Sequence, residues 1–402
     1  MKEKDNFFKN VENSPFSPKK PLIIAELGTS HNANMGKAKE MVCAASETGA
    51  DCVKFQMVFA DEILHPNTGE VTLPGGKIRL YDRFKALETP VEFYAQIKEF
   101  VEAKGLLFLC TPFGMKSAAL LRELKPKIVK IASPELNYTG LLKEIANWGL
   151  PVLLSSGVSR LSDIENAMGI FRKDITQRHK DTQRSQSCDI LSATELRSDG
   201  FFEGSFLCLL HCVTAYPAPE TDYNLKVLPN LAGIFGVSVG VSDHSSDPEL
   251  VPALAVAMGA SVIEKHFCLS KTDPGLDDPI ALPPDEFSQM VRAVCRAAEI
   301  GTDETLAFYG RERGEELVTQ ILGSGVKELA PSEKANYRLT NRSIHALRDI
   351  QKGEILKRGD YAVLRTEKIL RPGLEPSWEK IIEGRAARNF IPAGEGIGFE
   401  DI

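Results

Sequence analysis

Two histidines follow neighbouring apolar runs of the sequence at positions where side chains could bind a metal. His211 lies inside "LLHCVTAYPAP", and His244 lies inside "GVSDHS" directly after Asp243. Neutral imidazoles from adjacent strands hold divalent metals well and leave coordination positions for water and substrate. A lone buried histidine is otherwise a core residue, and His266 in "IEKHF" is either a third ligand or structural. The pair predicts a metal site.

Three lysines also lie in apolar runs: Lys54 in "CVKFQ", Lys130 in "KIVKIAS" and Lys265 in "IEKHF". Burying an unpaired ammonium is costly. Each lysine therefore pairs with a carboxylate, binds an anionic ligand or forms a Schiff base, and the sequence leaves these three alternatives open. Lys265 is expected near the mouth of an anion site. Hydroxyl groups that could complete the site stand at the ends of other runs: Thr111, Ser133 and Ser155.

Glu26 and Tyr216 are two further candidates for contact with a substrate. Glu26 ends the first apolar run, in "IIAELGTSHN". A carboxylate there could serve a sugar hydroxyl, a metal-bound water or a lysine. Tyr216 lies in "TAYPAP", where the prolines stiffen the loop after His211, and such an aromatic-proline turn is often structural.

Eight β-branched runs alternate with helical patterns between residues 21 and 301, and they must position these side chains. The alternation predicts a (β/α)₈ TIM barrel, with a doubly wound open sheet as the competing fold. The barrel is favoured because polar residues end nearly every run. The carboxyl ends of barrel strands converge on one mouth, whereas the outer strands of an open sheet lie too far apart to share a ligand.

Composition narrows the class of partner. The chain has 402 residues, a net charge of −7 and a pI near 5.7, which argue against a nucleic-acid partner. Its first twenty residues lack the apolar core of a signal peptide, and no later run has the length of a membrane span. We therefore expect a cytoplasmic protein with reduced cysteines that acts on small molecules.

Three segments fall outside the predicted barrel. Residues 1–20 form an N-terminal extension, and the polar stretch 172–200 is expected to be a mobile insertion opposite the mouth, without a catalytic part. A charged linker is expected over 302–335. From 336 to 402 the chain predicts a small β-rich domain, in which "DIQKGEIL" and "FIPAGEGI" form a quasi-repeat. A domain this small is expected to pack against the barrel or another subunit.

Taken in order, the strand-end motifs resemble those of the sialic acid synthase family, the phosphoenolpyruvate-dependent synthases of N-acetylneuraminate and related nonulosonic acids. The matching blocks are "IAELGTSHN", "VKFQ", "CTPF", "KIASPE", "LLSSG", "LLHCVTAYPAP", "GVSDHS" and "IEKHF" followed by "PGLDD". The segment "NRSIHALRDIQKGEIL" is similar to the family's antifreeze-like SAF domain, a β-clip fold. The resemblance covers about residues 21 to 402.

The resemblance implies a set of roles for these residues. His211 and His244 would bind Mn²⁺ or Mg²⁺, while Glu26, Tyr216 and Asp277 would lie near an acyclic, N-acylated amino sugar. The SAF domain would cover the partner subunit's mouth in a domain-swapped homodimer, so that Arg342 reaches the N-acyl group. Phosphoenolpyruvate would lie against a lysine and three hydroxyls: Lys54, Thr111, Ser133 and Ser155.

The reaction implied is condensation of phosphoenolpyruvate with an N-acetylmannosamine-type sugar, with C–O cleavage that releases phosphate. The loop "PGLDDPIALPP" (274–284) departs from the family pattern, so the resemblance leaves the sugar open among N-acetylmannosamine, its phosphate and the precursors of legionaminic or pseudaminic acid. Two other readings are a Schiff-base pyruvate aldolase on the same barrel, which needs no metal, and a non-catalytic sugar-binding protein.

Overall fold

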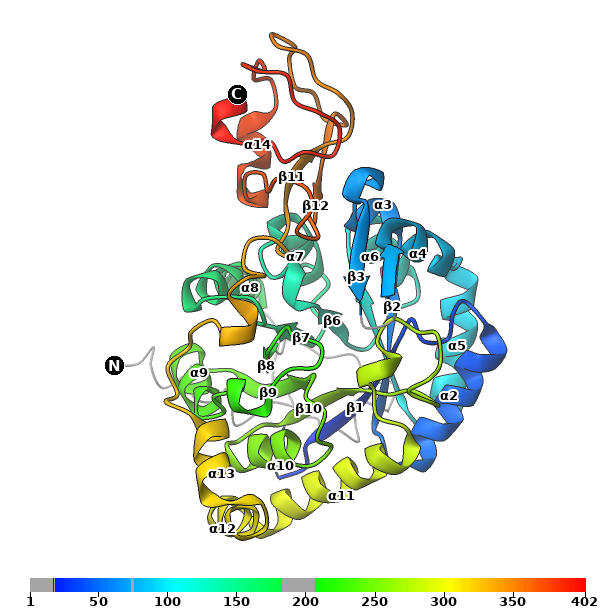
Figure 1. Cartoon of the computed structure of the whole chain (residues 1–402), viewed down its shortest axis with the longest axis vertical. Helices are drawn as coiled ribbons and strands as arrows, with labels where there is room; N and C mark the ends of the chain where they lie inside the picture. Colours follow the sequence, from blue (N-terminus) through cyan, green and yellow to red (C-terminus); the bar gives the residue numbers. More distant parts are fainter. Residues whose placement is uncertain (1–16, 18, 74–75, 183–206) are drawn as a thin grey trace.

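Eight apolar runs form the parallel strands of one barrel in the computed structural model, which describes residues 17, 19–73, 76–182 and 207–402 (Figure 1). The strands hydrogen-bond in the order β5-β2-β1-β10-β9-β8-β7-β6, and β5 lies beside β6, so the sheet nearly closes on itself. All eight predicted strands are confirmed: β1 (Leu22–Gly28), β2 (Cys52–Met57), β5 (Leu107–Pro112), β6 (Val129–Ile131), β7 (Val152–Ser155), β8 (Leu207–Cys212), β9 (Ser238–Asp243) and β10 (Val262–His266).

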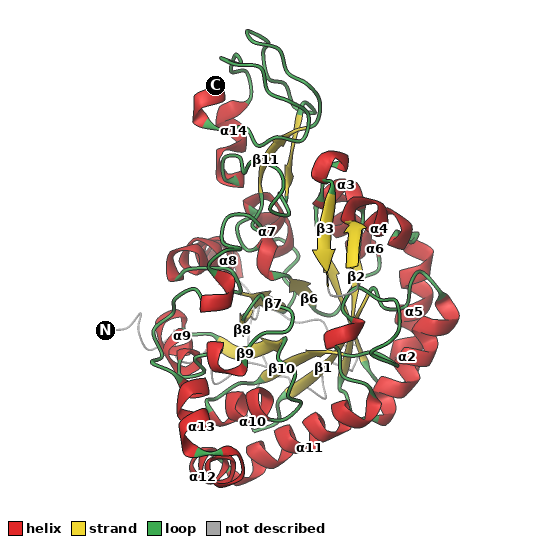
Figure 2. Ribbon diagram, viewed as in Figure 1, coloured by secondary structure: helices red, strands yellow, loops and turns green. Residues whose placement is uncertain are grey.

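Helices follow the strands and form a ring around the barrel (Figure 2). Their apolar faces pack on the outward side chains of the strands; in α5, for instance, Phe93, Tyr94, Ile97 and Val101 are buried, as the helical spacing predicts. This outer layer is the main core of the protein. The ring consists of α2 (Met35–Glu47), α5 (Val91–Ala103), α6 (Met115–Glu123), α7 (Thr139–Ala146), α8 (Leu161–Thr182), α9 (Val227–Phe235), α10 (Leu250–Ala257) and α11 (Pro284–Ile300).

The barrel interior changes character along its axis. The half farther from the carboxyl ends of the strands is filled by a small apolar cluster that includes Ile24, Leu109 and Leu210. Successive strand residues point to opposite faces, so the residue two places after each of these also points inward. Those inward positions, near the carboxyl ends, are polar or carry a thiol: Glu26, Lys54, Thr111, Lys130, Ser155, Cys212, Ser242 and Glu264. The barrel is therefore filled by apolar groups below and by a polar layer beneath the mouth.

Three connections differ from the sequence prediction. The expected charged linker contains helices α12 (Thr302–Arg313) and α13 (Glu315–Leu322), because Tyr309, Val318 and Ile321 are buried in the main core. The link from β2 to α5 holds an unpredicted hairpin, β3 (Glu70–Leu73) with β4 (Gly76–Arg79), between α3 (Ala60–Ile63) and α4 (Leu80–Leu87). The first residues of the predicted insertion continue α8 to Thr182, and the rest of it lies outside the described residues, as does most of the N-terminal extension.

The C-terminal segment folds around its own apolar cluster, which includes Ile344, Leu356 and Ile391. It contains the antiparallel pair β11 (Ser343–Ala346) and β12 (Tyr361–Leu364) and the short helix α14 (Glu379–Ile382). The two halves of the quasi-repeat pair with each other through Ile350 and Ile391. Among the described residues, no helix is long and apolar enough to cross a membrane.

Candidate active site

The polar layer is organised around Glu264, which the sequence did not single out for a role. Its Oε1 accepts from the ammonium groups of Lys54 at 2.6 Å and of Lys130 at 2.9 Å, and from the hydroxyl of Ser242 at 2.9 Å. Lys54 also lies 3.5 Å from Glu26 Oε2. Two lysines on β2 and β6 thus share one carboxylate on β10 in the middle of the barrel.

This sharing moves the pKa values of the three groups in different directions. Burial opposes the charged form of each, but the two lysines outweigh it at Glu264 and hold its pKa far below the usual range. Glu26 and Glu264 likewise raise the pKa of Lys54 against the effect of burial. Burial dominates at Lys130 and lowers its pKa to about 8. Lys54 is therefore a firmly charged ammonium near neutral pH, and Lys130 titrates closer to neutrality.

Glu26 faces the same layer from β1, and one of its oxygens accepts no hydrogen bond from the described residues. Its Oε1 accepts from Gln56 Nε2 at 2.6 Å, while its Oε2 is buried and accepts no hydrogen bond from the described residues. Burial, only partly offset by Lys54, raises its pKa to about 7. A carboxyl group with that pKa can give and take a proton near neutral pH.

Hydroxyl groups on the opposite wall are poised for a ligand. Thr111 Oγ1 and Ser155 Oγ are buried and lack a hydrogen-bond partner among the described residues. Ser133 Oγ accepts from the backbone N–H of Gly157 at 2.9 Å. A Cβ at Gly157 would lie 2.2 Å from Thr214 Oγ1, so this close approach requires glycine. The three predicted hydroxyls therefore line one side of the barrel, and two of them have unused hydrogen-bonding capacity.

Lys327, which sequence reasoning missed, brings a further ammonium to this end of the barrel. Its Nζ is buried and has no partner among the described residues, and burial lowers its pKa. Nearby, Glu333 anchors the segment that follows α13, since its Oε1 accepts from the backbone N–H groups of Val158 and Thr214, both at 2.7 Å. An unpaired buried ammonium is costly, which marks Lys327 as a site for an anion.

His211 does not face the barrel interior, which corrects the predicted metal pair. It directly follows Leu210 on β8, whose side chain points into the barrel. In register beside it on β9 is Val241, whose side chain belongs to the core between the strands and the helices. Its Nε2 donates to the Tyr223 carbonyl at 2.6 Å, and burial lowers its pKa to about 3. Side chains alternate between faces, so His211 points toward the helices. It is a neutral core histidine.

The histidines that the structure brings together are His244 and His266, with ring centroids 5.4 Å apart. Tyr216, which is partly exposed, stacks on His244 at 4.3 Å. His244 Nδ1 donates to the Val213 carbonyl at 2.9 Å, an arrangement that leaves Nε2 as the free acceptor. Burial lowers the pKa of His266 well below its usual value, so this ring suits a metal as a neutral ligand. At His244 the neighbouring Cys212 outweighs burial and raises the pKa, so a metal there would compete with a proton.

The donor set around these rings limits the kind of metal site. Asp277 Oδ2 lies 3.8 Å from His266 Nδ1, and burial raises the pKa of Asp277 to about 6. Among the described residues, no group of three or more His, Cys, Asp or Glu side chains is arranged to hold a metal. The two imidazoles fit a divalent ion whose remaining ligands are water and substrate, as in open catalytic sites.

Lys265 is also misplaced by the sequence prediction. It alternates with Glu264 and His266 on β10 and therefore points outward. Its Nζ binds Asp243 Oδ2 at 2.5 Å and the Ser245 carbonyl at 2.6 Å, contacts that fix the loop after β9. The ammonium of Lys265 is consequently a structural group rather than part of the anion site.

The unusual loop 274–284 is held by its own residues. Asp278 is fully buried and accepts from the backbone N–H of Gly275 at 2.7 Å, and Arg83 donates to the Pro274 carbonyl at 2.9 Å. Asp278 therefore builds the loop, while the neighbouring Asp277 faces His266.

Comparison with known proteins decides the family. The NeuB family profile matches residues 41–305, well over half of the chain, and the SAF domain profile matches residues 341–402. The chain belongs to the NeuB family. Relatives of this NeuB-family protein extend over nearly its whole length. It is 33% identical over 385 residues to the spore coat polysaccharide biosynthesis protein SpsE of Bacillus subtilis, with 95% of this chain and 93% of that protein covered.

Other relatives carry enzyme names, among them two synthases. The N,N'-diacetyllegionaminic acid synthase of Legionella pneumophila is 33% identical over 386 residues, covering 95% of this chain and 94% of that protein. The pseudaminic acid synthase of Campylobacter jejuni is 31% identical over 390 residues, covering 96% and 97%. The crystal structure of the Bacillus subtilis SpsE protein has a TM-score of 0.73 at 32% identity and covers 95% of each chain.

Membership of the NeuB family identifies the protein as an enzyme that forms a carbon–carbon bond. It does not favour the non-catalytic sugar-binding reading. The Schiff-base aldolase is not favoured either, because each of the three candidate lysines binds a carboxylate: Lys54, Lys130 and Lys265.

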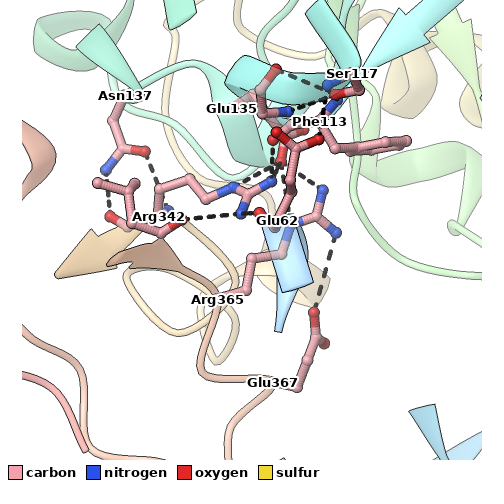
Figure 3. Close-up of polar contacts among 10 residues, drawn as sticks. Glu62, Phe113, Ser117, Glu135, Asn137, Arg342, Arg365 and Glu367 are labelled. Carbon is pink, nitrogen blue, oxygen red and sulfur yellow. Dashed lines mark hydrogen bonds and ion pairs between the residues drawn. The ribbon is translucent and has the colours of Figure 1, made fainter. Parts of the chain in front are cut away.

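In this NeuB-family enzyme, two arginines of the SAF domain meet a single carboxylate of the barrel (Figure 3). Arg342 and Arg365 both donate to Oε1 of Glu135, in the short helix η2 (Ser133–Glu135) that follows β6. The side chain of Arg342 is fully buried and also donates to the carbonyls of Glu62, Phe113 and Val363. In this structure Arg342 contacts the mouth of its own barrel, and its reach into the partner subunit's site stays a prediction.

Proposed function

We propose that this NeuB-family enzyme condenses phosphoenolpyruvate with an open-chain, N-acylated amino sugar of the mannosamine type, producing a nonulosonic acid and phosphate. One observation carries the proposal. A ring of buried ionised and hydroxyl groups lies directly beneath a histidine pair at the mouth. Several of these groups have a polar atom without a hydrogen-bond partner among the described residues: Glu26, Thr111, Ser155 and Lys327. Such a site is complementary to a small, multiply charged ligand.

Phosphoenolpyruvate would bind deep in the barrel. Lys54, which Glu26 and Glu264 keep charged against the effect of burial, would hold the carboxylate. The free hydroxyls of Thr111 and Ser155, the Ser133 hydroxyl and the unpaired ammonium of Lys327 would hold the phosphate. Charge-assisted hydrogen bonds of this kind are roughly twice as strong as neutral ones. These groups form the anion site without Lys265, whose ammonium binds Asp243 instead.

The sugar would enter above phosphoenolpyruvate, between Glu26 and Tyr216. C3 of phosphoenolpyruvate attacks the aldehyde carbon, and the aldehyde oxygen takes a proton from Glu26, whose pKa of about 7 keeps it partly protonated at neutral pH. The cationic C2 that results is stabilised by the phosphate oxygens and takes up water, which gives back a proton. The C–O bond to phosphate then breaks and leaves a 2-keto acid, so that water is consumed and phosphate is released.

A divalent ion, Mn²⁺ or Mg²⁺, fits His244 and His266, the two imidazoles at the mouth. Bound there, it would supply Lewis acidity to the aldehyde oxygen. Tyr216, stacked on His244, would hold the ring in place and shield it from water, and Asp277 would orient His266.

The function is tested by phosphate release from phosphoenolpyruvate with a panel of sugars, with Mn²⁺ and with excess EDTA. The panel contains N-acetylmannosamine, its 6-phosphate, and the diacetamido-trideoxyhexoses that precede legionaminic and pseudaminic acid. We expect release with one sugar only, and its loss in EDTA. Borohydride trapping of pyruvate on a lysine, or release that EDTA leaves unchanged, would refute the proposal in favour of the aldolase or of a metal-free synthase.

Lys327→Met is expected to raise the KM for phosphoenolpyruvate by about tenfold to a hundredfold, because it removes a charged donor to phosphate. The KM for the sugar should stay within about twofold of the wild-type value. Lys334→Met is the matched control, since Lys334 is exposed in the same segment. Steady-state kinetics with each substrate varied in turn would check both values, and an unchanged KM for phosphoenolpyruvate would exclude Lys327 from the phosphate site.

A further inference from the structure

The segment between α13 and β11 is bonded to two turns at the carboxyl ends of barrel strands (Figure 1). Val158 lies in the turn after β7, and Thr214 lies in the turn after β8. Glu333 Oε1 accepts from the backbone N–H groups of both residues, each at 2.7 Å. Asn341 Nδ2 donates to the Val158 carbonyl at 3.2 Å, and Asn336 Nδ2 donates to the Thr214 carbonyl at 3.1 Å. One segment therefore binds both the N–H and the carbonyl group of each turn residue.

Val158 has a backbone conformation that valine rarely adopts. Its φ is 47°, in the left-handed region, where a β-branched residue is a genuine outlier. Its side chain is fully buried in the protein. Such a conformation persists only where the surrounding structure determines it, and it is typical of functional sites. The bonds from Glu333 and Asn341 supply this constraint, because they fix the peptide groups on both sides of Val158.

The turn after β7 also orients a hydroxyl group of the phosphate site. Val158 follows Gly157, whose N–H donates to Ser133 Oγ at 2.9 Å. This bond occupies a lone pair of the hydroxyl oxygen and leaves its proton for an acceptor such as a phosphate oxygen. A Cβ at Gly157 would lie 2.9 Å from Ser133 Oγ and 2.2 Å from Thr214 Oγ1, so the turn has no room to shift between its neighbours. A change at Val158 would therefore displace the N–H group that orients Ser133.

A local role for Glu333 is the competing interpretation. Its Oε2 accepts from the backbone N–H of Ala330 at 3.3 Å, which closes the short helix Pro331–Glu333. This local bond is the longest of the three, whereas both bonds of Oε1 reach turns of the barrel. Glu333 is only 1% exposed, and hydrogen bonds to a carboxylate are roughly twice as strong as neutral ones. The charge of Glu333 is therefore used mainly to hold the two turns.

We propose that Glu333 is a positioning residue for the phosphate of phosphoenolpyruvate. It fixes Val158, so that Gly157 orients the Ser133 hydroxyl toward the phosphate oxygens. This rests on the proposed function and extends it: the segment that follows the barrel supplies Lys327 as a ligand of the phosphate and Glu333 as the group that holds Ser133 in place. Glu333 itself does not contact the substrate.

The first test uses Glu333→Gln, which keeps the length of the side chain and removes its charge. We expect the KM for phosphoenolpyruvate to rise about tenfold, with the KM for the sugar within about twofold of the wild-type value. Asp247→Asn is the matched control, because Asp247 Oδ1 also accepts from two backbone N–H groups, those of Glu249 and Leu250, but within its own turn. Equal rises in both KM values, or a rise that the control matches, would reduce Glu333 to a structural role and overturn the proposal.

A double-mutant cycle tests whether Glu333 acts through Ser133. Ser133→Ala alone should raise the KM for phosphoenolpyruvate about tenfold, because it removes a donor to the phosphate. Adding Glu333→Gln to Ser133→Ala should raise it further by less than about threefold, since the hydroxyl that Glu333 positions is already gone. If the effects of the two substitutions multiply, they are independent, and the path through Val158 and Gly157 is refuted.

A binding measurement separates this proposal from the proposed function. Calorimetry with phosphoenolpyruvate alone reports binding without turnover. Binding that weakens about tenfold in Glu333→Gln supports the proposal even if no sugar gives phosphate release, a result that would defeat only the proposed function. Equal binding to both proteins overturns the role of Glu333, and no binding to the wild type overturns both.

Asn341→Asp keeps the test decisive if Glu333→Gln does not fold. Aspartate retains the acceptor for the Arg338 N–H but turns an oxygen instead of an N–H donor toward the Val158 carbonyl. We expect weaker binding of phosphoenolpyruvate in this variant as well, and unchanged binding would contradict the proposal.

Discussion

His266→Ala is expected to lower both Mn²⁺ affinity and phosphate release by at least about a hundredfold, while the protein keeps its fold. The reason is that His266 supplies one of the two imidazoles at the mouth, 5.4 Å from His244, and removal of even an indirect metal partner costs about tenfold to a hundredfold. Calorimetric titration with Mn²⁺ measures the affinity without any substrate, and the phosphate assay measures the activity.

His211→Gln is the matched control for this experiment. Glutamine keeps an N–H donor at the distance of Nε2 and preserves the bond to the Tyr223 carbonyl, so the variant should bind Mn²⁺ as the wild type does. The opposite pattern, with metal lost in His211→Gln and kept in His266→Ala, would restore the metal pair expected from the sequence and refute the assignment made from the structure.

The error over His211 shows where sequence reasoning ends. Strand β8 is buried on both faces, and its residues Leu209, Leu210 and Cys212 are apolar on either side of the histidine. In such a strand no alternation of polar and apolar residues reports which face a side chain occupies. Only the register with β9, where His211 stands beside Val241, settles it. The same ambiguity led to Lys265 being placed in the anion site instead of against Asp243.

Other features were predictable because their signals are local. The eight strands and the helices between them follow from hydrophobic periodicity, and the quasi-repeat correctly indicated a β-rich C-terminal domain whose two halves pair through Ile350 and Ile391. Glu264, Lys327 and Arg365 carry no such signal. Their importance comes from partners more than a hundred residues away, such as Lys130 for Glu264 and Glu135 for Arg365. For Lys327 it comes from the lack of a hydrogen-bond partner in the part of the chain that the structure describes.

Glu264→Ala is expected to lower the free energy of unfolding by about 3–5 kcal/mol and to abolish phosphate release. The variant would leave the ammonium groups of Lys54 and Lys130 buried without their shared carboxylate, and breaking a buried ion pair from one side costs that much. Chemical denaturation at pH 7 measures the loss. Glu264→Gln retains an acceptor for Ser242 but carries no charge, so it should lower the free energy of unfolding by only part of this amount.

The stability that the Glu264 carboxylate contributes should fall as the pH is lowered. The folded-state pKa of Glu264 lies below its unfolded value, so the carboxylate contributes its full stability above about pH 5 and loses it as the pH falls through the folded pKa. The difference between the wild type and Glu264→Gln should therefore shrink as the pH falls below about 5, which is below the range in which Glu26 and Lys130 titrate. A difference that grows toward low pH would mean that the two lysines do not hold this carboxylate ionised.

A triple variant shows why the ion cluster exists at all. Replacing Lys54, Lys130 and Glu264 together by methionine removes both the charges and the cost of burying them, and such exchanges are often neutral or stabilising by about 1–4 kcal/mol. We expect a protein at least as stable as the wild type and devoid of phosphate release. If the triple variant were instead as unstable as Glu264→Ala, the cluster would be a structural element of the barrel. A stable, inactive protein would mean that the barrel bears the cost of three buried charges because the reaction needs them beneath the mouth.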